Sequence, residues 1–321
     1  QAVAEAASQC SGGGVTVSVD LNKDHKDRQV ASLTASPAEF TSSLANNSAL
    51  SALMNDGLVR PLNNLIAKHA SGLQDMQFVT VDGEVMAIAY MANAQHLFYR
   101  SDILDAAGVA PPKTYEEVLA AAKTIKDKGL MEYPIAGTYA GWNLGLEFIN
   151  MYLGHGGEFF ESGSAKPAVN NSKGVATLNM MKSLTEYMNP DFLTYDSNAV
   201  QADWEAGKVA LTNLWGSRAG PVTDGEGSTP EIESNTKFTS APTVAGGSRP
   251  ATTLWWDGFT VATNISDEDA EATFKAMMNG ISTQMAVANA EKANWLIKGA
   301  QPNPAGVGVL ASASGGTLPY P

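Results

Sequence analysis

Residues 252–263 have the sequence TTLWWDGFTVAT, which is the most informative stretch of the chain. In its second half the apolar side chains of Phe259 and Val261 recur at every other position, which is typical of a β-strand. Successive side chains of a strand point to opposite faces, so Trp255 and Trp256 face different sides unless a bend or a bulge intervenes. Gly258 permits such a bend, or a close approach of a neighbouring backbone. The stretch therefore predicts a strand that begins with two aromatic residues.

Two interpretations of the group Trp255-Trp256-Asp257 stay open. In the first, one tryptophan packs in the core, the other lies at its rim, and Asp257 belongs to a turn. In the second, the group binds a sugar, which offers a C–H face for stacking on an indole and hydroxyls for hydrogen bonds to the carboxylate.

A helix is predicted directly after this strand. Ser266 is a good N-cap, and the acidic residues 267–269 fall in the first turn, where the helix dipole favours negative charge. Ala270, Phe274, Met277 and Met278 then form an apolar stripe at helical spacing.

The N-terminal part of the chain alternates predicted helices and strands. Strands are expected at 15–20 and 39–45, and helices at 26–35 and after Ser48. This alternation predicts an α/β fold with a parallel, doubly wound sheet. Ligands of such sheets bind at the carboxyl ends of the strands, where residues 46–48 lie, so Asn47 is a candidate ligand residue. The alternative is that these polar residues form only a cap and a turn.

Further along the chain, several apolar residues are expected to be packing residues. The helix that follows Asn171 is predicted to bury Val175, Leu178, Met181 and Leu184, and Trp204 is predicted to lie in the core. His96 either contacts ligand or caps a strand, and the sequence leaves both open.

Composition excludes several classes of function. The chain has 321 residues, a net charge of −13 and a sequence pI near 4.7, which argues against binding to nucleic acid or to anionic membranes. No apolar run is long enough for a membrane span. The single cysteine, Cys10, rules out an internal disulfide and cysteine-rich zinc sites. Cys10 is followed by serine and glycines, as at the start of a mature bacterial lipoprotein, so lipid anchoring is an alternative.

No motif for catalysis, metal or cofactor binding is found. The four histidines lie in unrelated contexts, and the sequence has neither a Walker loop nor a G-x-S-x-G elbow. Asp203 and Asp257 could be proposed as a glycosidase pair, since two carboxylates are all that this reaction needs. We therefore expect no enzyme, and a glycoside hydrolase is the least favoured alternative.

Four motifs in order give the chain its most specific signal. They are GLVRPLN at 57–63, DGEVMAIAY at 82–90, LFYRSDILDAAGVAPPKTYEEV at 97–118 and WEAGKVALTNLW at 204–215. Together they resemble, over roughly residues 40 to 280, the extracellular solute-binding proteins of family 1. These are the sugar-binding components of ABC importers and include maltose- and trehalose-binding proteins. Arg100 and Tyr115 depart from the family's usual Asn and Trp.

The resemblance implies a two-lobe periplasmic-binding-protein fold of type II. Each lobe would be a mostly parallel sheet flanked by helices, with hinge crossings between the lobes. We expect residues 1–92 plus 262–300 in the N-lobe, and residues 95–258 plus 301–321 in the C-lobe. The family's chains usually extend further at both ends, so this chain is expected to be trimmed or unusually short.

The resemblance also implies the function. It predicts capture of a sugar, oligosaccharide or polyol in the cleft between the lobes and delivery to the transmembrane subunits of an ABC permease, by a monomeric protein of the periplasm. A lectin-like carbohydrate-binding module without transport is the main alternative. The ligand residues that it implies, with Arg218 and Trp256 as weaker additions, are Asn47, Asn93, Tyr139, Trp142, Trp215, Arg218, Trp255, Trp256 and Asp257.

Overall fold

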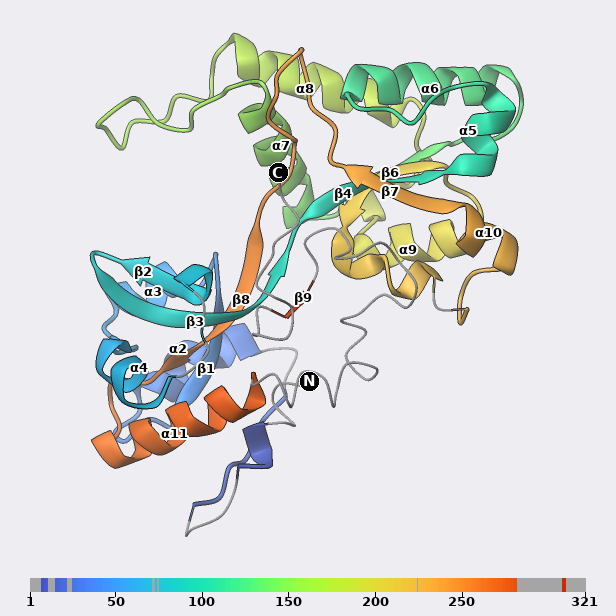
Figure 1. Cartoon of the computed structure of the whole chain (residues 1–321). Helices are drawn as coiled ribbons and strands as arrows, with labels where there is room; N and C mark the ends of the chain where they lie inside the picture. Colours follow the sequence, from blue (N-terminus) through green and yellow to red (C-terminus); the bar gives the residue numbers. More distant parts are fainter. Residues whose placement is uncertain are drawn as a thin grey trace. The chain divides into compact units, whose positions relative to one another are not determined.

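The chain folds into two compact units. The computed structural model describes residues 7–10, 15–21, 25–70, 73, 75–223, 225–281 and 308–309. Of these described residues, the first unit contains those up to Asn93 and those from Trp255 on, and the second contains those of Ala94–Leu254. The chain thus leaves the first unit once and returns to it once, within the described residues (Figure 1).

The first unit is built on one antiparallel sheet. Its strands follow the order β1 (Ser42–Asn46), β8 (Trp255–Val261), β3 (Glu84–Asn93) and β2 (Phe78–Val81), and β9 (Gly308–Val309) pairs with the end of β3. The long strand β3 ends at the unit's boundary and β8 begins there. Because one strand leads out of the unit and the other leads back in, their pairing as neighbours makes them antiparallel.

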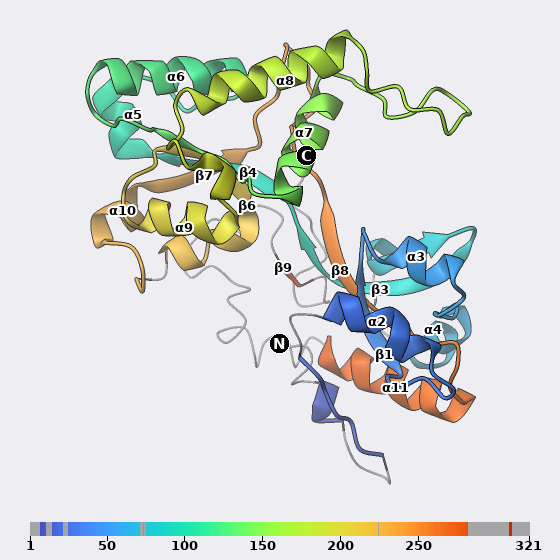
Figure 2. The same cartoon turned by 180° about the vertical axis from the view of Figure 1, so that it is seen from behind.

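Helices cover both faces of this sheet. On one face α4 (Asn63–His69) and α11 (Asp267–Gly280) pack on Ile88 and Phe259. On the other, α2 (His25–Thr34) and α3 (Leu50–Asn55) pack on Ala45 and Ala87 (Figure 2). The N-cap of α11 is Ser266, whose side-chain oxygen accepts from the Asp269 amide at 3.0 Å, as predicted.

The second unit has a mixed sheet of four strands. The order is β5 (Ile135–Ala136), β6 (Leu211–Trp215), β4 (Gln95–Arg100) and β7 (Thr236–Ser240). Strands β5 and β6 are parallel, whereas β4 is antiparallel to both β6 and β7. The carboxyl ends of β5 and β6 therefore lie at the same edge of the sheet.

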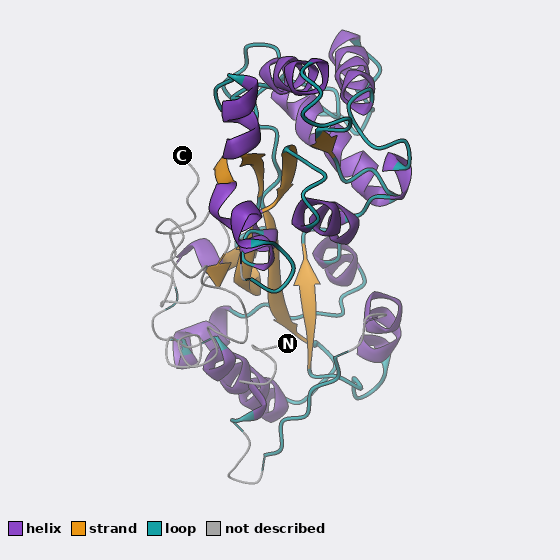
Figure 3. Ribbon diagram, turned by 90° about the vertical axis from the view of Figure 1, so that its right-hand side faces the viewer, coloured by secondary structure: helices purple, strands orange, loops and turns teal. Residues whose placement is uncertain are grey.

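Two groups of helices sandwich the second sheet (Figure 3). One face carries α5 (Ser101–Ala107), α6 (Tyr115–Asp127), α7 (Trp142–Gly154) and α8 (Ser172–Thr185), and the other carries α9 (Ser197–Glu205) and α10 (Pro230–Asn235). Short 3-10 turns lie at Asp75–Gln77, Phe192–Thr194, Gly216–Arg218 and Pro221–Thr223. Trp204 of α9 is fully buried, as predicted.

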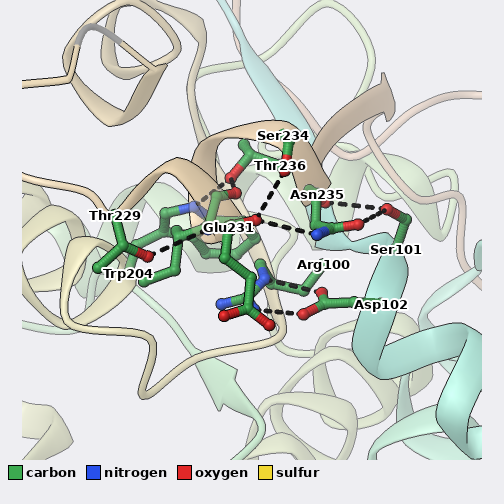
Figure 4. Close-up of polar contacts among 10 residues, drawn as sticks. Arg100, Ser101, Asp102, Trp204, Thr229, Glu231, Ser234, Asn235 and Thr236 are labelled. Atoms are coloured by element: carbon green, nitrogen blue, oxygen red, sulfur yellow. Dashed lines mark hydrogen bonds and ion pairs between the residues drawn. The ribbon is translucent and has the colours of Figure 1, made fainter.

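Arg100, a departure from the family pattern, has a structural role. Its side chain is buried, and its Nε and Nη2 donate to the two carboxylate oxygens of Asp102 at 2.9 and 2.5 Å (Figure 4). A guanidinium and a carboxylate in this two-bond geometry form a strong, directional pair. Asp102 lies in the first turn of α5, so the pair fixes the junction of β4 and α5.

Several predictions about the fold need correction. The sheets are not mostly parallel, because among the described strands only the β5–β6 pair runs in parallel. Residues 255–258 belong to the first unit rather than to 95–258, since β8 pairs with β1 and β3 along its whole length. Of the tail 301–321, assigned above to the C-lobe, the described strand β9 pairs with β3 of the first unit. The described residues 15–20 form a single bridge at Val15 instead of a strand.

The orientation of α8 also differs from the prediction. Met181 and Leu184 are buried as expected, but Val175 and Leu178 are 55% and 58% exposed. The buried side of the helix consists of Gly174, Thr177, Met181 and Leu184, and a Cβ on Gly174 would lie 2.3 Å from the Val169 carbonyl oxygen. Val175 and Leu178 lie outside this buried side.

Candidate functional site

Five of the predicted ligand residues gather at one end of the first unit's sheet. Pairing places Asn93 opposite Trp255, and both Met91 and Asn46 opposite Asp257. Asn47 follows β1 directly, and its Oδ1 accepts from the Trp256 amide at 2.9 Å. The group comprises Asn47, Asn93, Trp255, Trp256 and Asp257, and we call it the β8 cluster. It lies where β8 begins and where β1 and β3 end (Figure 1).

The backbone beside the β8 cluster is irregular. On β3 the register shifts between Ala89 and Met91, so Tyr90 is the extra residue of a bulge. Opposite it, a Cβ on Gly258 would lie 2.5 Å from the Ile88 carbonyl oxygen. The prediction that Gly258 permits a close backbone approach is confirmed, although the bulge is on the partner strand.

The two tryptophans have different surroundings. Trp256 packs against buried Ala89, as Val79 also does. Trp255 lies on the same face of β8 as Asp257, and its Nε1 donates to Asp257 Oδ1 at 3.2 Å. Burial and, to a smaller extent, the negative charge of Asp257 raise the pKa of the Tyr90 phenol above its usual value. The carboxylate of half-buried Asp257 thus has the Trp255 indole as a hydrogen-bond donor and acts electrostatically on the Tyr90 phenol.

In the second unit, the predicted residues follow the carboxyl ends of β5 and β6. Trp142 is the first residue of α7 and is 65% exposed. Trp215 ends β6 and is 8% exposed, and Tyr139 is 4% exposed and packs edge-on against Phe192. Of these three aromatic side chains only that of Trp142 is presented openly at the surface, and the ligand roles of all three stay predictions.

Arg218 is held by the helix beside it. Its Nη1 donates to Gln201 Oε1 and its Nη2 to Ser197 Oγ, each at 2.8 Å, so the guanidinium is anchored to α9. Burial lowers its pKa from the usual value. These contacts give Arg218 a structural role. Its role as a ligand residue, which was the weaker of the assignments, stays a prediction.

A buried polar network in the second unit was missed by the sequence analysis. Its centre is Glu147 of α7, which is 5% exposed. Glu147 Oε1 accepts from Thr138 Oγ1 and from Gln95 Nε2, each at 2.7 Å. Burial raises the pKa of its carboxyl to about 7, and these two hydrogen bonds oppose the shift. The signal that could have revealed it is an acid between Leu146 and Phe148 on an otherwise apolar helix.

Other polar side chains considered above have structural surroundings. His96 is buried in β4, between β6 and β7, and burial lowers its pKa to about 4, so it is neutral at pH 7. Asp203 accepts from the Tyr195 hydroxyl at 2.5 Å and pairs with Lys208 at 3.3 Å. Neither residue belongs to the β8 cluster.

The described part of the second unit contains a small and a larger cavity. One, of about 20 Å³, is lined by Tyr115, Tyr139 and Glu147 and is too small for a sugar. The other, of about 250 Å³, is lined by Tyr133, Tyr195, Asp203 and Lys208 and contains none of the predicted ligand residues.

The described residues contain no cluster of three or more His, Cys, Asp or Glu side chains that could hold a metal ion. Among the helices that the structure describes, none is long and apolar enough to cross a membrane.

Comparison with known proteins identifies the family. A model of the bacterial extracellular solute-binding protein family matches residues 29–314, most of the chain. The chain belongs to this family. As a solute-binding protein it is expected to bind its substrate rather than to transform it, in agreement with the sequence analysis.

A curated relative and several solved structures are similar to this solute-binding protein. A probable ABC transporter-binding protein of Deinococcus radiodurans is 30% identical over 146 residues, 42% of this chain. The matched part spans 34% of that relative's length. Maltose-bound MalE3 of T. maritima has a TM-score of 0.73 at 20% identity, covering 83% of this chain and 68% of that chain. A ribitol-bound ABC transporter solute-binding protein of Agrobacterium radiobacter K84 has a TM-score of 0.75 at 20% identity, covering 91% and 74%. These structures confirm the two-lobe α/β fold.

Proposed function

We propose that the chain is the substrate-binding component of an ABC importer and that it captures a sugar, an oligosaccharide or a polyol. The observation that carries the proposal is the pairing of Trp255 with Asp257 in the β8 cluster, beside Asn47 and Asn93. The indole offers a face for the C–H groups of a sugar, and the carboxylate and amides offer partners for its hydroxyls. The maltose and ribitol in similar structures support this ligand class.

We further propose a place and a partner for this activity. The protein would act as a monomer in the periplasm and deliver its ligand to the transmembrane subunits of a permease. The name of the Deinococcus relative, an ABC transporter-binding protein, supports the transporter. Cys10 is exposed and forms no disulfide, and lipid attachment there is the alternative to a freely diffusing protein.

The first prediction is binding without turnover. Calorimetric titration with a panel of mono-, di- and oligosaccharides and polyols should give saturable binding to at least one of them. Chromatography of the ligand after long incubation should recover it unchanged, because the β8 cluster contains one carboxylate and no second acid. Release of cleaved sugar would contradict the proposal and would favour the glycoside hydrolase.

The second prediction separates an importer component from a lectin-like module. Importer components undergo a hinge motion when ligand binds, since the closed state makes contacts that the open state lacks. Small-angle X-ray scattering should therefore give a smaller radius of gyration at ligand saturation than without ligand. An unchanged radius at saturation would favour a rigid carbohydrate-binding module.

A further inference from the structure

The buried network around Glu147 joins the ends of the second unit to helix α7. In the segment Ala94–Leu254, which makes up the described part of this unit, Gln95 is the second residue and Thr253 is the last but one. Gln95 Nε2 donates to Glu147, and Gln95 Oε1 accepts from Asn150 Nδ2. Asn150 Oδ1 in turn accepts from Thr253 Oγ1 at 2.5 Å. One continuous chain of side-chain hydrogen bonds thus connects the segment where the polypeptide enters the unit with the segment where it leaves.

A hydrogen bond from backbone to side chain also joins the two ends. The backbone N–H of Gln95 donates to Thr252 Oγ1 at 2.9 Å. Glu147 and Asn150 lie three residues apart, on the same face of α7, which explains how one helix reaches both ends. Gln95, Thr138, Glu147 and Asn150 are all buried, so each lost hydrogen bond would leave an unsatisfied polar group away from water.

The network also reaches residues 137–141, which connect β5 to α7 and which we call the Thr138 loop. Thr138, which donates to Glu147, directly precedes Tyr139, and the same loop leads to Trp142 at the start of α7. Gln95 pairs with Trp215 across the sheet. A change in the Glu147 carboxyl therefore acts on the backbone that holds Tyr139 and Trp215.

We propose that Glu147 is a pH-sensitive positioning residue, which in its protonated form holds both ends of the second unit and the Thr138 loop in the arrangement that binds ligand. The ligand part of this proposal rests on the proposed function. The carboxyl is neutral when protonated, and a neutral acid is the form that a dry interior accommodates. Deprotonation would place a charge in the centre of the network, and the network would loosen or admit water to solvate it.

Among the residues that the structure describes, no positively charged side chain is found to act on Glu147. The titratable groups that face Glu147 are the phenols of Tyr115 from α6 and Tyr139 from the Thr138 loop. Burial, and then the charge of Glu147, raises the pKa of both phenols, so they are neutral in the range in which Glu147 titrates. Gln95, Thr138 and Asn150 carry no charge.

The sign of the pH dependence follows from the raised pKa of Glu147. The folded protein binds this proton more tightly than the unfolded chain, so the contribution of Glu147 to stability is complete below pH 4.5 and is lost as pH rises through about 7. If the pKa of Glu147 differs by one between the folded and the unfolded protein, the folding equilibrium constant changes by a factor of ten. We expect the total loss to be on the order of a hundredfold.

The test compares the wild type with Glu147→Gln, which keeps the accepting oxygen and stays neutral at every pH. Denaturant unfolding from pH 4.5 to 8.5 should show the wild type losing stability relative to Glu147→Gln by on the order of a hundredfold in the equilibrium constant. The exposed acid Glu186 provides the matched control, since Glu186→Gln should follow the wild-type profile. Coincident profiles of the wild type and Glu147→Gln would overturn the proposal.

Ligand affinity provides the second readout. Between pH 6 and 8.5 the wild type should lose affinity for the best sugar by several-fold relative to Glu147→Gln. Equal affinity profiles, together with different stability profiles, would overturn the positioning role and leave Glu147 a stability element. If no sugar binds, the proposed function fails while the stability comparison still tests Glu147. If Glu147→Gln does not fold, carboxyl NMR on the wild type decides, because a Glu147 pKa below 5.5 would refute the proposal.

Discussion

Replacing Trp255 by alanine should weaken ligand binding by about 30- to 150-fold. A sugar stacked on this indole would bury on the order of 100 Å² of apolar surface, worth roughly 2–3 kcal/mol at about 25 cal/mol per Å². Each 1.4 kcal/mol changes the dissociation constant tenfold, which gives the expected range. The indole is half-buried and its Nε1 donates to Asp257, so truncation would also remove a contact that orients the carboxylate. Calorimetric titration of the variant with the best sugar measures the effect.

The neighbouring residue Leu254 offers a matched control. It is exposed, precedes Trp255 directly and was not predicted to contact ligand, so Leu254→Ala should change the affinity less than twofold. Both variants should unfold at nearly the wild-type denaturant concentration. A Trp255→Ala variant that binds sugar as tightly as the wild type would remove the β8 cluster from the ligand site.

Local features of this fold could be predicted from the sequence because their causes are local. Ser266 caps α11, and Thr114 caps α6 through the Glu117 amide at 3.1 Å. In each case the cap and the group it satisfies lie within one helical turn. The close approach at Gly258 was also predictable, since a glycine inside a strand signals a neighbouring backbone.

Strand direction could not be predicted in the same way. The alternation of helices and strands favours parallel pairing only when each helix returns the chain to the same sheet. Here β3 leads out of the first unit and β8 leads back after an entire second unit, so neighbouring strands oppose each other. A pattern within a window of ten or twenty residues contains no information about so distant a return.

The candidate site was predictable in part for a similar reason. Trp255 and Asp257 are two residues apart on one strand, so their shared face follows from the strand alone. The role of Glu147 depends on a hydrogen bond from Gln95, 52 residues earlier, and on burial in the interior of the second unit. Neither can be read from a local sequence pattern. The local sequence indicated this role only by placing a single acid between apolar residues of a helix.

Trp204→Ala should produce the largest loss of stability and leave the ligand affinity of the folded protein nearly unchanged. The indole is fully buried in the second unit, packs edge-on against Phe98 at 6.0 Å between ring centroids, and donates from Nε1 to Thr236 Oγ1 at 3.0 Å (Figure 4). Removing a buried tryptophan leaves a cavity, and we expect the free energy of unfolding to fall by about 3–5 kcal/mol. Urea denaturation measures this loss.

Two further variants serve as controls. Trp204→Phe keeps an aromatic ring but not the N–H, so it should lower the free energy of unfolding by only about 1–2 kcal/mol. The exposed Trp142 is the stability control, because Trp142→Ala creates no cavity and should change the unfolding free energy by less than about 0.5 kcal/mol. If Trp204→Ala kept its stability and lost all binding, the ligand would lie beside α9 and the assignment of the β8 cluster would be wrong.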